Sequence, residues 1–409
     1  MALRMLWVSD EVPDAGRGGG SIRQHHLLKR TAAFAEVDLV LVGQLTDGEL
    51  ASLLHGVTCL PRPQDPLAAW GSGALGTARR RLHNLATTLP GRPPSEVALN
   101  CRVVQALRQH VGNASGYDVV QVEHEHLAGV LPRHRNGRWA ITLHNLLSVR
   151  CRQRAAVTDK PRVRRLWEAD ARRAAAWERR IVNGYDLTFA VSAEDAEALG
   201  GRTEVVPNGV DLEGFPATPV PPAHSMIFSA SFNYEPNIDG AVWLCEEILP
   251  RVRSEVPDAT LLLVGRQPHE RVRRLAALPG VDAHFDVPSV FPLLAAARVA
   301  LVPLRQGSGT RLKALEAMAA GRPLAGTPVG LEGLGLVDGE SALMSDSAEG
   351  VARAAVRLLL DDGTATRVAT SARSLAERHF GWDSLAERYL DSVLRRRQAG
   401  MPASPAPPR

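Results

Sequence analysis

The sequence predicts an α/β protein with two domains, each built on a parallel sheet that is covered by helices. Short apolar runs alternate with longer amphipathic runs along the chain, which is the pattern of parallel strands joined by helices. The chain of 409 residues is long enough to form two cores. A proline-rich stretch at 216–222 interrupts the alternation and predicts a linker between the two halves.

The composition is that of an ordinary globular protein. Hydrophobic residues make up 45% and charged residues 22%, and the net charge of +4 does not by itself require a nucleic-acid partner. The four cysteines are widely spaced and form no C-x-x-C pair, so neither a zinc site nor a disulfide framework is predicted. The first residues do not resemble a signal peptide, and no apolar run is long enough to span a membrane. We therefore expect a cytoplasmic protein.

The start of the chain has the order of a nucleotide-binding unit. A buried strand is predicted at 3–8, a glycine-rich loop at 16–21 and an amphipathic helix at 22–34. The loop contains Gly19 and Gly20, but a dinucleotide fingerprint would have a further glycine where this chain has a serine. That motif is therefore weak, and a plain exposed loop is the alternative interpretation.

Polar residues follow two of the strands predicted in the first half. One strand ends in Glu123 and His124, which a second acid–histidine pair follows, and the strand at 139–143 ends in His144 and Asn145. Ligand sites of open α/β sheets lie at the carboxyl ends of their strands. The acid–histidine run is also compatible with a metal site, although no further ligand set follows it. The second pair is also compatible with a hydrogen-bonded strand cap. The first of these two strands is predicted at 118–122, further strands at 37–42, 186–191 and 203–206, and a short helix at 75–89.

The segment 150–180 is unusually basic. It holds eleven arginines and lysines against four acidic residues, and we expect one long helix with a solvated basic face. A face that meets anionic lipid headgroups or a phosphate-bearing acceptor is the sharper alternative. Nucleic acid is disfavoured because the segment carries no recognisable nucleic-acid motif and little aromatic interleaving.

The second half repeats the alternation of strands and helices. A final helix follows Trp382 and ends near 397, and residues 398–409 are expected to form a disordered tail. Strands are predicted at 226–230, 260–264 and 299–303, and helices at 238–249, 348–360 and 364–379.

The most informative stretch is 304–334, in which a loop of small residues leads into a helix at 310–320. Backbone N–H groups at such a helix start attract anions, and Arg311 and Lys313 add positive charge there. Glu316 lies three residues after Lys313 and shares its helix face. A diphosphate attached to a ribose fits this arrangement, since the cations take phosphate and the carboxylate accepts from hydroxyls. The alternative is a surface helix with an ion pair between Lys313 and Glu316.

The same stretch carries a family resemblance. The run from Glu316 to Pro323, EAMAAGRP, and the turn Thr327-Pro328-Val329-Gly330 resemble the donor-binding region of retaining glycosyltransferases of family 4, also described as glycosyl transferases group 1. That family has a Glu-x7-Glu pair, and the first glutamate would fall on Ser308. The departure looks like a subgroup that reads R-x-G-S/A-G-T-R-x-K. The P-N-G-V-D run at 207–211 is similar to the family's entry into its second domain.

The resemblance implies the GT-B fold, in which two doubly wound, Rossmann-like domains face a central cleft. The acceptor-binding domain would be 1–215 and the nucleotide-sugar-binding domain 223–375, with a helix at 376–397 that crosses back to the first domain. The implied reaction is transfer of a sugar from a nucleoside diphosphate sugar, with retention of configuration, to a glycan, a lipid-linked glycan or a small metabolite. The chain has no D-x-D motif, so a metal-independent reaction is expected, with no cofactor beyond the nucleotide-sugar substrate.

The resemblance also implies roles for particular residues. His144 and Asn145 would bind the acceptor, and either Glu123 or His124 would contact the reacting sugar. The implied catalytic residues are His124, Glu123, His144, Lys313 and Arg311. The implied donor-binding residues are Gly19, Gly20, Ser231, Gly307, Ser308, Gly309, Thr310, Arg311, Leu312, Lys313 and Glu316.

Two other functions stay open from the sequence. An epimerase on the same fold would convert the nucleotide sugar without an acceptor. A dinucleotide-dependent oxidoreductase needs an acidic ribose ligand at the end of the second strand, and Asp38, at the start of that strand, fits poorly. In the lipid interpretation, the basic segment predicts a peripheral contact with anionic lipid on the inner face of the plasma membrane. The sequence names neither the sugar, the base nor the acceptor.

Overall fold

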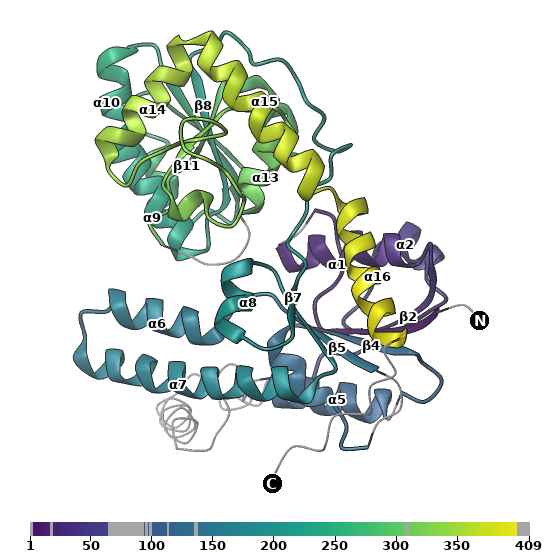
Figure 1. Ribbon diagram of the computed structural model, residues 1–409. Coiled ribbons are helices and arrows are strands. Elements are labelled where there is room, and N and C mark those ends of the chain that lie inside the picture. The colour runs from purple at the N-terminus through teal and green to yellow at the C-terminus, as the bar shows by residue number, and fades with distance from the viewer. Residues whose placement is uncertain are drawn as a thin grey trace. The chain divides into compact units, whose positions relative to one another are not determined.

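The computed structural model describes residues 3–16, 19–63, 94, 97, 100–112, 114–134, 138–306 and 311–398. The described chain forms two compact units, each with its own parallel sheet (Figure 1). The first unit contains residues up to Pro207 and those from Leu385 onward, and the second contains 208–384. The short helix expected at 75–89, the small-residue loop at 307–310 and most of the expected tail lie outside the described residues.

The first unit is built on a seven-stranded parallel sheet with the order β3-β2-β1-β4-β5-β6-β7. The interior strand β1 is buried along almost its whole length because helices cover both faces of such a sheet. The strands are β1 (Leu3–Ser9), β2 (Ala35–Val42), β3 (Gly56–Leu60), β4 (Val119–Glu123), β5 (Arg138–Leu143), β6 (Leu187–Ala190) and β7 (Thr203–Val205). The helices are α1 (Gly19–Thr31), α2 (Gly48–Leu53), α5 (Cys101–Val111), the 3-10 helix η2 (Glu125–Val130), α6 (Leu147–Val157), α7 (Pro161–Gly184), α8 (Ala193–Leu199) and most of α16 (Trp382–Gln398).

The second unit has a six-stranded parallel sheet with the order β10-β9-β8-β11-β12-β13, so both sheets reverse their strand order beside the first strand. Its core packs around β8 and β11, whose apolar residues are buried. The strands are β8 (Ser225–Ser231), β9 (Thr260–Arg266), β10 (Val281–Phe285), β11 (Val299–Val302), β12 (Leu324–Gly326) and β13 (Leu343–Met344). The helices are α9 (Glu235–Trp243), the π-helix η3 (Leu244–Ile248), α10 (Leu249–Glu255), α11 (Glu270–Leu275), α12 (Phe291–Ala296), α13 (Leu312–Ala319), the 3-10 helix η4 (Val329–Leu331), α14 (Ala348–Leu360) and α15 (Asp362–His379).

Three predicted helix boundaries were wrong. The first helix begins at Gly19 instead of 22, so both glycines belong to its first turn. The basic segment forms two helices, α6 and α7, because Pro161 begins a new helix and the residue before it is extended. These two helices pack against each other (Figure 1). The helix expected at 238–249 begins earlier, at Glu235, and continues through the π-helix into α10.

The chain passes from the first unit to the second between Pro207 and Asn208, ahead of the proline-rich stretch at 216–222. Hydrogen bonds explain this position. The N–H of Val210 donates to the carbonyl of Phe380, and the N–H of Thr218 donates to that of Ala320. The fully buried guanidinium of Arg322 donates to the carbonyls of Thr218 and Pro219. The proline-rich stretch is therefore packed into the second unit.

Candidate active site

Both sheets gather polar residues at the point where their strand order reverses, beyond the carboxyl ends of the strands. In the first unit this point lies between β1 and β4, and in the second between β8 and β11. Ligands of doubly wound sheets bind at such points, because the connections leave the two strand ends in opposite directions and open a crevice there. Each unit therefore has a candidate ligand site of its own.

The first unit holds a cluster of three imidazoles, each hydrogen-bonded to its own carboxylate. Nε2 of His124 lies 2.7 Å from Oε2 of Glu11, and Nε2 of His126 lies 3.0 Å from Oδ1 of Asp10. Nε2 of His144 lies 2.6 Å from Oε2 of Glu123. We call these six residues the histidine cluster. The carboxylates come from the chain after β1 and from β4, and the rings come from the ends of β4 and β5 and from η2.

The three rings also pack on one another. The centroids of His124 and His144 are 4.1 Å apart, and the ring of His126 stacks on His124 at 5.3 Å. His124 has φ of 75°, a left-handed conformation that few residues other than glycine adopt. Such strain costs on the order of 1–3 kcal/mol and concentrates at functional sites. The unusual backbone turns the His124 ring between its two neighbours.

The cluster separates one charged imidazole from one neutral imidazole. Burial opposes the charge of His124, but the hydrogen bond to Glu11 and the surrounding carboxylates raise its pKa to about 9. Burial, and then the charges of His124 and Arg23, lower the pKa of His144 well below its usual value. Burial also raises the pKa of Glu123 to about 7, against the charges of Arg23 and His124. At pH 8, His124 is therefore a cation and His144 is neutral.

Gly20 packs against this cluster so closely that there is no room for a larger residue at this position. A Cβ atom at Gly20 would lie 2.4 Å from Oε2 of Glu11 and 3.0 Å from Cε1 of His124, both too close for a stable contact. Any side chain there displaces the Glu11–His124 pair. The predicted contact of Gly19 and Gly20 with a donor phosphate is not tested by this geometry and stays a prediction.

The second unit holds a smaller group on α13, α9 and the end of β8, which we call the α13 cluster: Lys313, Glu316, Asn237 and Ser231. Nζ of Lys313 donates to Oδ1 of Asn237 at 2.6 Å and lies 5.2 Å from the centroid of the Phe228 ring. Nδ2 of Asn237 in turn donates to the carbonyl of Ser231 at 2.8 Å. The end of β8 therefore orients Lys313 through one amide side chain.

Lys313 and Glu316 lie on one face of α13, but their side chains do not form an ion pair with each other in the described structure. Among the described residues, no ion pair as short as 4.0 Å joins them, so the alternative of a simple surface ion pair does not hold in this conformation. Burial and the neighbouring Arg311 lower the pKa of Lys313 to about 7. Burial raises the pKa of Glu316 to about 7, against the charges of Lys313 and Arg266. Both side chains are only partly shielded from water.

The remaining predicted site residues belong to neither of the two clusters. The Arg311 guanidinium donates to the carbonyl of Val329 at 2.9 Å and lies 3.8 Å from Glu332, so it braces the turn after β12. Leu312 packs against the core of the second unit, and Asn145 is half-buried beside the histidine cluster. Gly307, Ser308, Gly309 and Thr310 lie outside the described residues, and their predicted roles stay predictions.

Several residues of these clusters were not predicted. Asp10 and Glu11 directly follow the first strand, and that position was the available signal. Arg266 ends β9, beside β8, and its charge acts on Glu316, although the sequence offered only Arg311 and Lys313 as cations. Asn237 lies in the first turn of α9. Its contact with Lys313, 76 residues away, carries no local signal.

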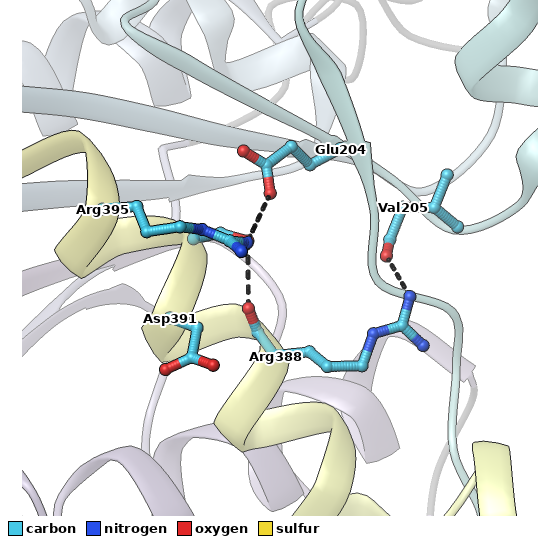
Figure 2. Close-up of a pocket in the computed structure, with 6 residues that line it drawn as sticks. Glu204, Val205, Arg388, Asp391 and Arg395 are labelled. Carbon is cyan, nitrogen blue, oxygen red and sulfur yellow. Dashed lines mark hydrogen bonds and ion pairs between the residues drawn. The ribbon is translucent and has the colours of Figure 1, made fainter. Parts of the chain in front are cut away.

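A separate cavity of about 370 Å³ lies in the first unit between β7 and α16. Figure 2 shows Arg395 beside Glu204 and Arg388 beside the carbonyl of Val205, so both guanidinium groups are already engaged within the protein. Among the described residues, no group of three or more histidine, cysteine or acidic side chains is arranged to hold a metal. Nor does any described helix have the length and apolar character needed to cross a bilayer.

Comparisons with known proteins agree with this geometry. The family Glycosyltransferase Family 4 matches residues 17–213, and the family Glycosyl transferases group 1 matches residues 223–361. The chain is 27% identical to a glycogen synthase of Mycobacterium tuberculosis over 94% of this chain and 92% of that protein. Its fold is similar to that of a sucrose-phosphate synthase from Thermosynechococcus elongatus, with a TM-score of 0.69 and 19% identity over 98% and 100% of the two chains. It is also similar to that of Anabaena HepE in complex with UDP and glucose, with a TM-score of 0.63 and 16% identity over 96% and 100%.

Proposed function

Since the chain belongs to glycosyltransferase family 4 and adopts the GT-B fold, we propose that it transfers a sugar from a nucleoside diphosphate sugar to an acceptor hydroxyl with retention of configuration. The α13 cluster carries the donor half of this proposal. Lys313 and Glu316 stand on one face of a helix at the strand-order reversal, where a cation and a carboxylate can bind diphosphate and ribose together.

The proposed reaction replaces one bond to the anomeric carbon by another and transfers one proton. The bond from the sugar's anomeric carbon to the diphosphate oxygen breaks, the bond to the acceptor oxygen forms on the same face, and the acceptor proton leaves with the diphosphate. Negative charge develops on the departing diphosphate, so donors that are already oriented toward it lower the barrier most. Lys313, which Asn237 orients, and the backbone N–H groups that begin α13 supply that stabilisation.

The first unit supplies the groups that orient the reacting sugar and the acceptor. His144 is neutral and His124 is positively charged, so the first can accept a hydrogen bond from a hydroxyl while the second favours an electron-rich oxygen. Asn145, next to His144, is the proposed acceptor contact. UDP is the first donor nucleotide to test, because the structural relative HepE binds UDP and glucose.

Thermal-shift measurements with UDP, GDP, dTDP and ADP would identify the base. Transfer assays with the matching nucleotide sugars and a panel of glycan acceptors would follow, and the proton coupling at the new linkage would report its configuration. We expect release of nucleoside diphosphate only with acceptor present. Conversion of the nucleotide sugar to its epimer without acceptor would favour the epimerase alternative, and an inverted linkage would contradict retention.

The same assay in excess chelator addresses the metal-independent part of the proposal. We expect undiminished turnover, because Lys313 and the α13 backbone are proposed to balance the diphosphate charge. Complete loss of activity that magnesium or manganese restores would contradict this assignment.

Peripheral docking on anionic lipid is a second proposal, on the α6–α7 pair. Arg162 and Arg165 are exposed on α7 beside Leu166, whose side chain is 49% exposed. Each basic residue near an anionic bilayer contributes about 1 kcal/mol, in a salt-sensitive way. We expect co-sedimentation with anionic but not neutral vesicles at low salt, weakened by Leu166→Ser. Leu360→Ser, at a comparably exposed leucine of α14, is the matched control. Protein that stays in the supernatant with anionic vesicles would contradict docking.

A further inference from the structure

A chain of buried hydrogen bonds runs from the histidine cluster to α16. Nε2 of Gln121 donates to Oε1 of Glu123 at 3.1 Å, and Oε2 of the same carboxylate lies 2.6 Å from Nε2 of His144. At the other end, the hydroxyl of Tyr389 donates to Oε1 of Gln121 at 2.9 Å. Gln121 and Glu123 are both fully buried, and Tyr389 is 1% exposed. The four residues come from β4, the end of β5 and α16.

The chemistry of these groups fixes the direction of the hydrogen bonds. The Gln121 amide must turn its nitrogen toward Glu123, because two oxygens facing each other would repel, and its oxygen then accepts from Tyr389. The same nitrogen also donates to Oγ1 of Thr142 at 2.9 Å. Oε1 of Glu123 is therefore occupied as an acceptor, and Oε2 alone is directed at His144.

We propose that Glu123 is a positioning residue that holds the proton of His144 on Nε2, so that Nδ1 presents a lone pair to a hydroxyl of the bound substrate. This inference rests on the proposed function for its consequence but not for its geometry. Of the described residues, none is seen to bond Nδ1 of His144. Glu123 itself is fully buried behind the ring, so it acts through His144 and not on the sugar.

The charges around the ring favour this protonation state at mildly alkaline pH. Burial and the positive charge of His124 keep His144 neutral, and Glu123 is mostly ionised above its pKa of about 7. An ionised carboxylate only accepts, so the shared proton must belong to the imidazole. The charged or titratable groups that act on His144 from the surrounding elements are Glu11 and Arg23 from the β1–α1 region, Glu123 and His124 from the end of β4, and Glu125 and His126 from η2.

Glu123→Gln inverts the proposed arrangement without changing the size of the side chain. Gln121 still donates to the inner oxygen, so the new amide must turn its NH2 group toward His144. The ring then has to accept at Nε2 and carry its proton on Nδ1. A comparable carboxylate-to-amide change in the Ser-His-Asp triad, a worked example of this effect, lowers kcat by about 10⁴ through the wrong tautomer. A substrate hydroxyl can also accept, so here we expect a smaller loss in kcat, roughly 10- to 100-fold, with KM little changed.

The decisive measurement is the ring nitrogen spectrum of the unliganded protein at pH 8, with ¹⁵N-labelled histidine and the His144 signals assigned through His144→Gln. We expect the wild-type ring with its proton on Nε2 and the Glu123→Gln ring with its proton on Nδ1. Glu178→Gln is the matched control, because Glu178 is a buried carboxylate in the same unit that accepts from the N–H of Ser148. It should leave both the His144 spectrum and kcat unchanged.

A wild-type ring with its proton on Nδ1 would overturn the proposal by itself, even if Glu123→Gln does not fold. A tautomer that inverts in the variant while kcat stays at the wild-type value would overturn the positioning role. The spectrum does not depend on turnover, so a failure of the proposed glycosyl transfer would be recognised separately. Tyr389→Phe, which removes only the outer donor, should keep the Nε2 proton and lower kcat by a few fold.

Discussion

The histidine cluster and the α13 cluster occupy the same topological position in their sheets but are stabilised in opposite ways. In the histidine cluster each ring has a carboxylate within 3.0 Å, so every imidazole has a hydrogen-bond partner inside the unit. In the α13 cluster, Nζ of Lys313 contacts the neutral amide of Asn237 and the Phe228 ring and forms no ion pair within the described part of the chain, and the pKa values of Lys313 and Glu316 are both shifted to about 7. The imidazoles are therefore paired within the protein, whereas Lys313 is placed to gain a charged partner from a bound anion.

This difference separates two tasks that an enzyme must perform. Groups that are oriented before the substrate arrives need no rearrangement during the reaction, so they act mainly on the transition state. A half-buried cation that forms no ion pair within the described residues gains when a negatively charged ligand binds, so it raises affinity in addition to stabilising the departing diphosphate. Substitutions in the α13 cluster should therefore change nucleotide affinity as well as kcat, and substitutions in the histidine cluster should change kcat without changing nucleotide affinity.

The largest effect is expected from Lys313→Ala. A hydrogen bond to a charged group contributes about 1.5–3 kcal/mol, and each 1.4 kcal/mol is tenfold in affinity. We expect the Kd for UDP, measured by calorimetry, to rise about 100-fold. His124→Ala is the counterpart in the other cluster and should leave that Kd within about twofold. Equal increases in the Kd for UDP in Lys313→Ala and His124→Ala would contradict the proposed difference between the two clusters.

Glu316→Ala should have the next largest effect. Loss of a charged hydrogen bond to the ribose costs roughly 1.5–3 kcal/mol, but removal of a half-buried carboxylate also relieves its desolvation, so we expect a 10- to 50-fold rise in Kd. Glu332→Ala is the control, since Glu332 is 52% exposed and its carboxylate lies 3.8 Å from Arg311, outside the α13 cluster. Unchanged affinity in Glu316→Ala, with the circular dichroism spectrum preserved, would rule out the ribose contact.

The pH dependence of binding should sharpen the comparison further. The ligand needs Lys313 charged, which holds below its pKa of about 7, and Glu316 ionised, which holds above its pKa of about 7. Affinity for UDP-glucose should therefore be greatest near pH 7 and fall on both sides by at most about tenfold per pH unit for each proton. Lys313→Arg should abolish the alkaline fall alone. If affinity in Lys313→Arg still falls above pH 7 as in the wild type, a group other than Lys313 causes that loss of affinity.

Gly20→Ala should have the smallest effect. The new Cβ displaces Glu11 from His124, but the carboxylate ends a flexible side chain and can move. We expect kcat to fall about three- to tenfold. We also expect the pH–rate profile to show a lower pKa for His124 than the wild-type value of about 9, because the Glu11 hydrogen bond that raises this pKa is weakened. Gly48→Ala, where a Cβ meets no atom within 4 Å, is the matched control and should change neither quantity.

Much of the fold was predictable from local pattern. The strands predicted at 3–8, 118–122 and 139–143 lie within one residue of β1, β4 and β5 at each end, because a parallel strand buried on both faces is a short apolar run. Helix starts were less predictable. Gly19 and Gly20 looked like a loop by composition, yet they open α1, and at Gly20 the close approach of Glu11 and His124 favours a residue without a side chain.

The local sequence pattern did not predict which residues contact each other within each cluster. The sequence marks His144 as a residue after a strand, but nothing near it in the chain indicates that Glu123 binds its ring. The contact between Gln121 and Tyr389 joins residues 268 positions apart. Such pairs depend on how strands and helices come together in three dimensions, and a single sequence carries no trace of that arrangement.

The division of α16 between the two units also determines the order in which the protein can be completed. Tyr389 packs against Trp7 and Phe189 in the first unit, with ring centroids 5.8 and 5.1 Å apart, yet it is synthesised after the whole second unit. At a translation rate of about 5–20 residues per second, the sheet of the first unit waits roughly ten to forty seconds for this helix. During that interval Trp7, Phe189 and Gln121 lack a partner that the finished protein supplies. A nascent chain arrested before Leu385 therefore exposes one side of its first sheet to chaperones and proteases, even after its second unit has folded.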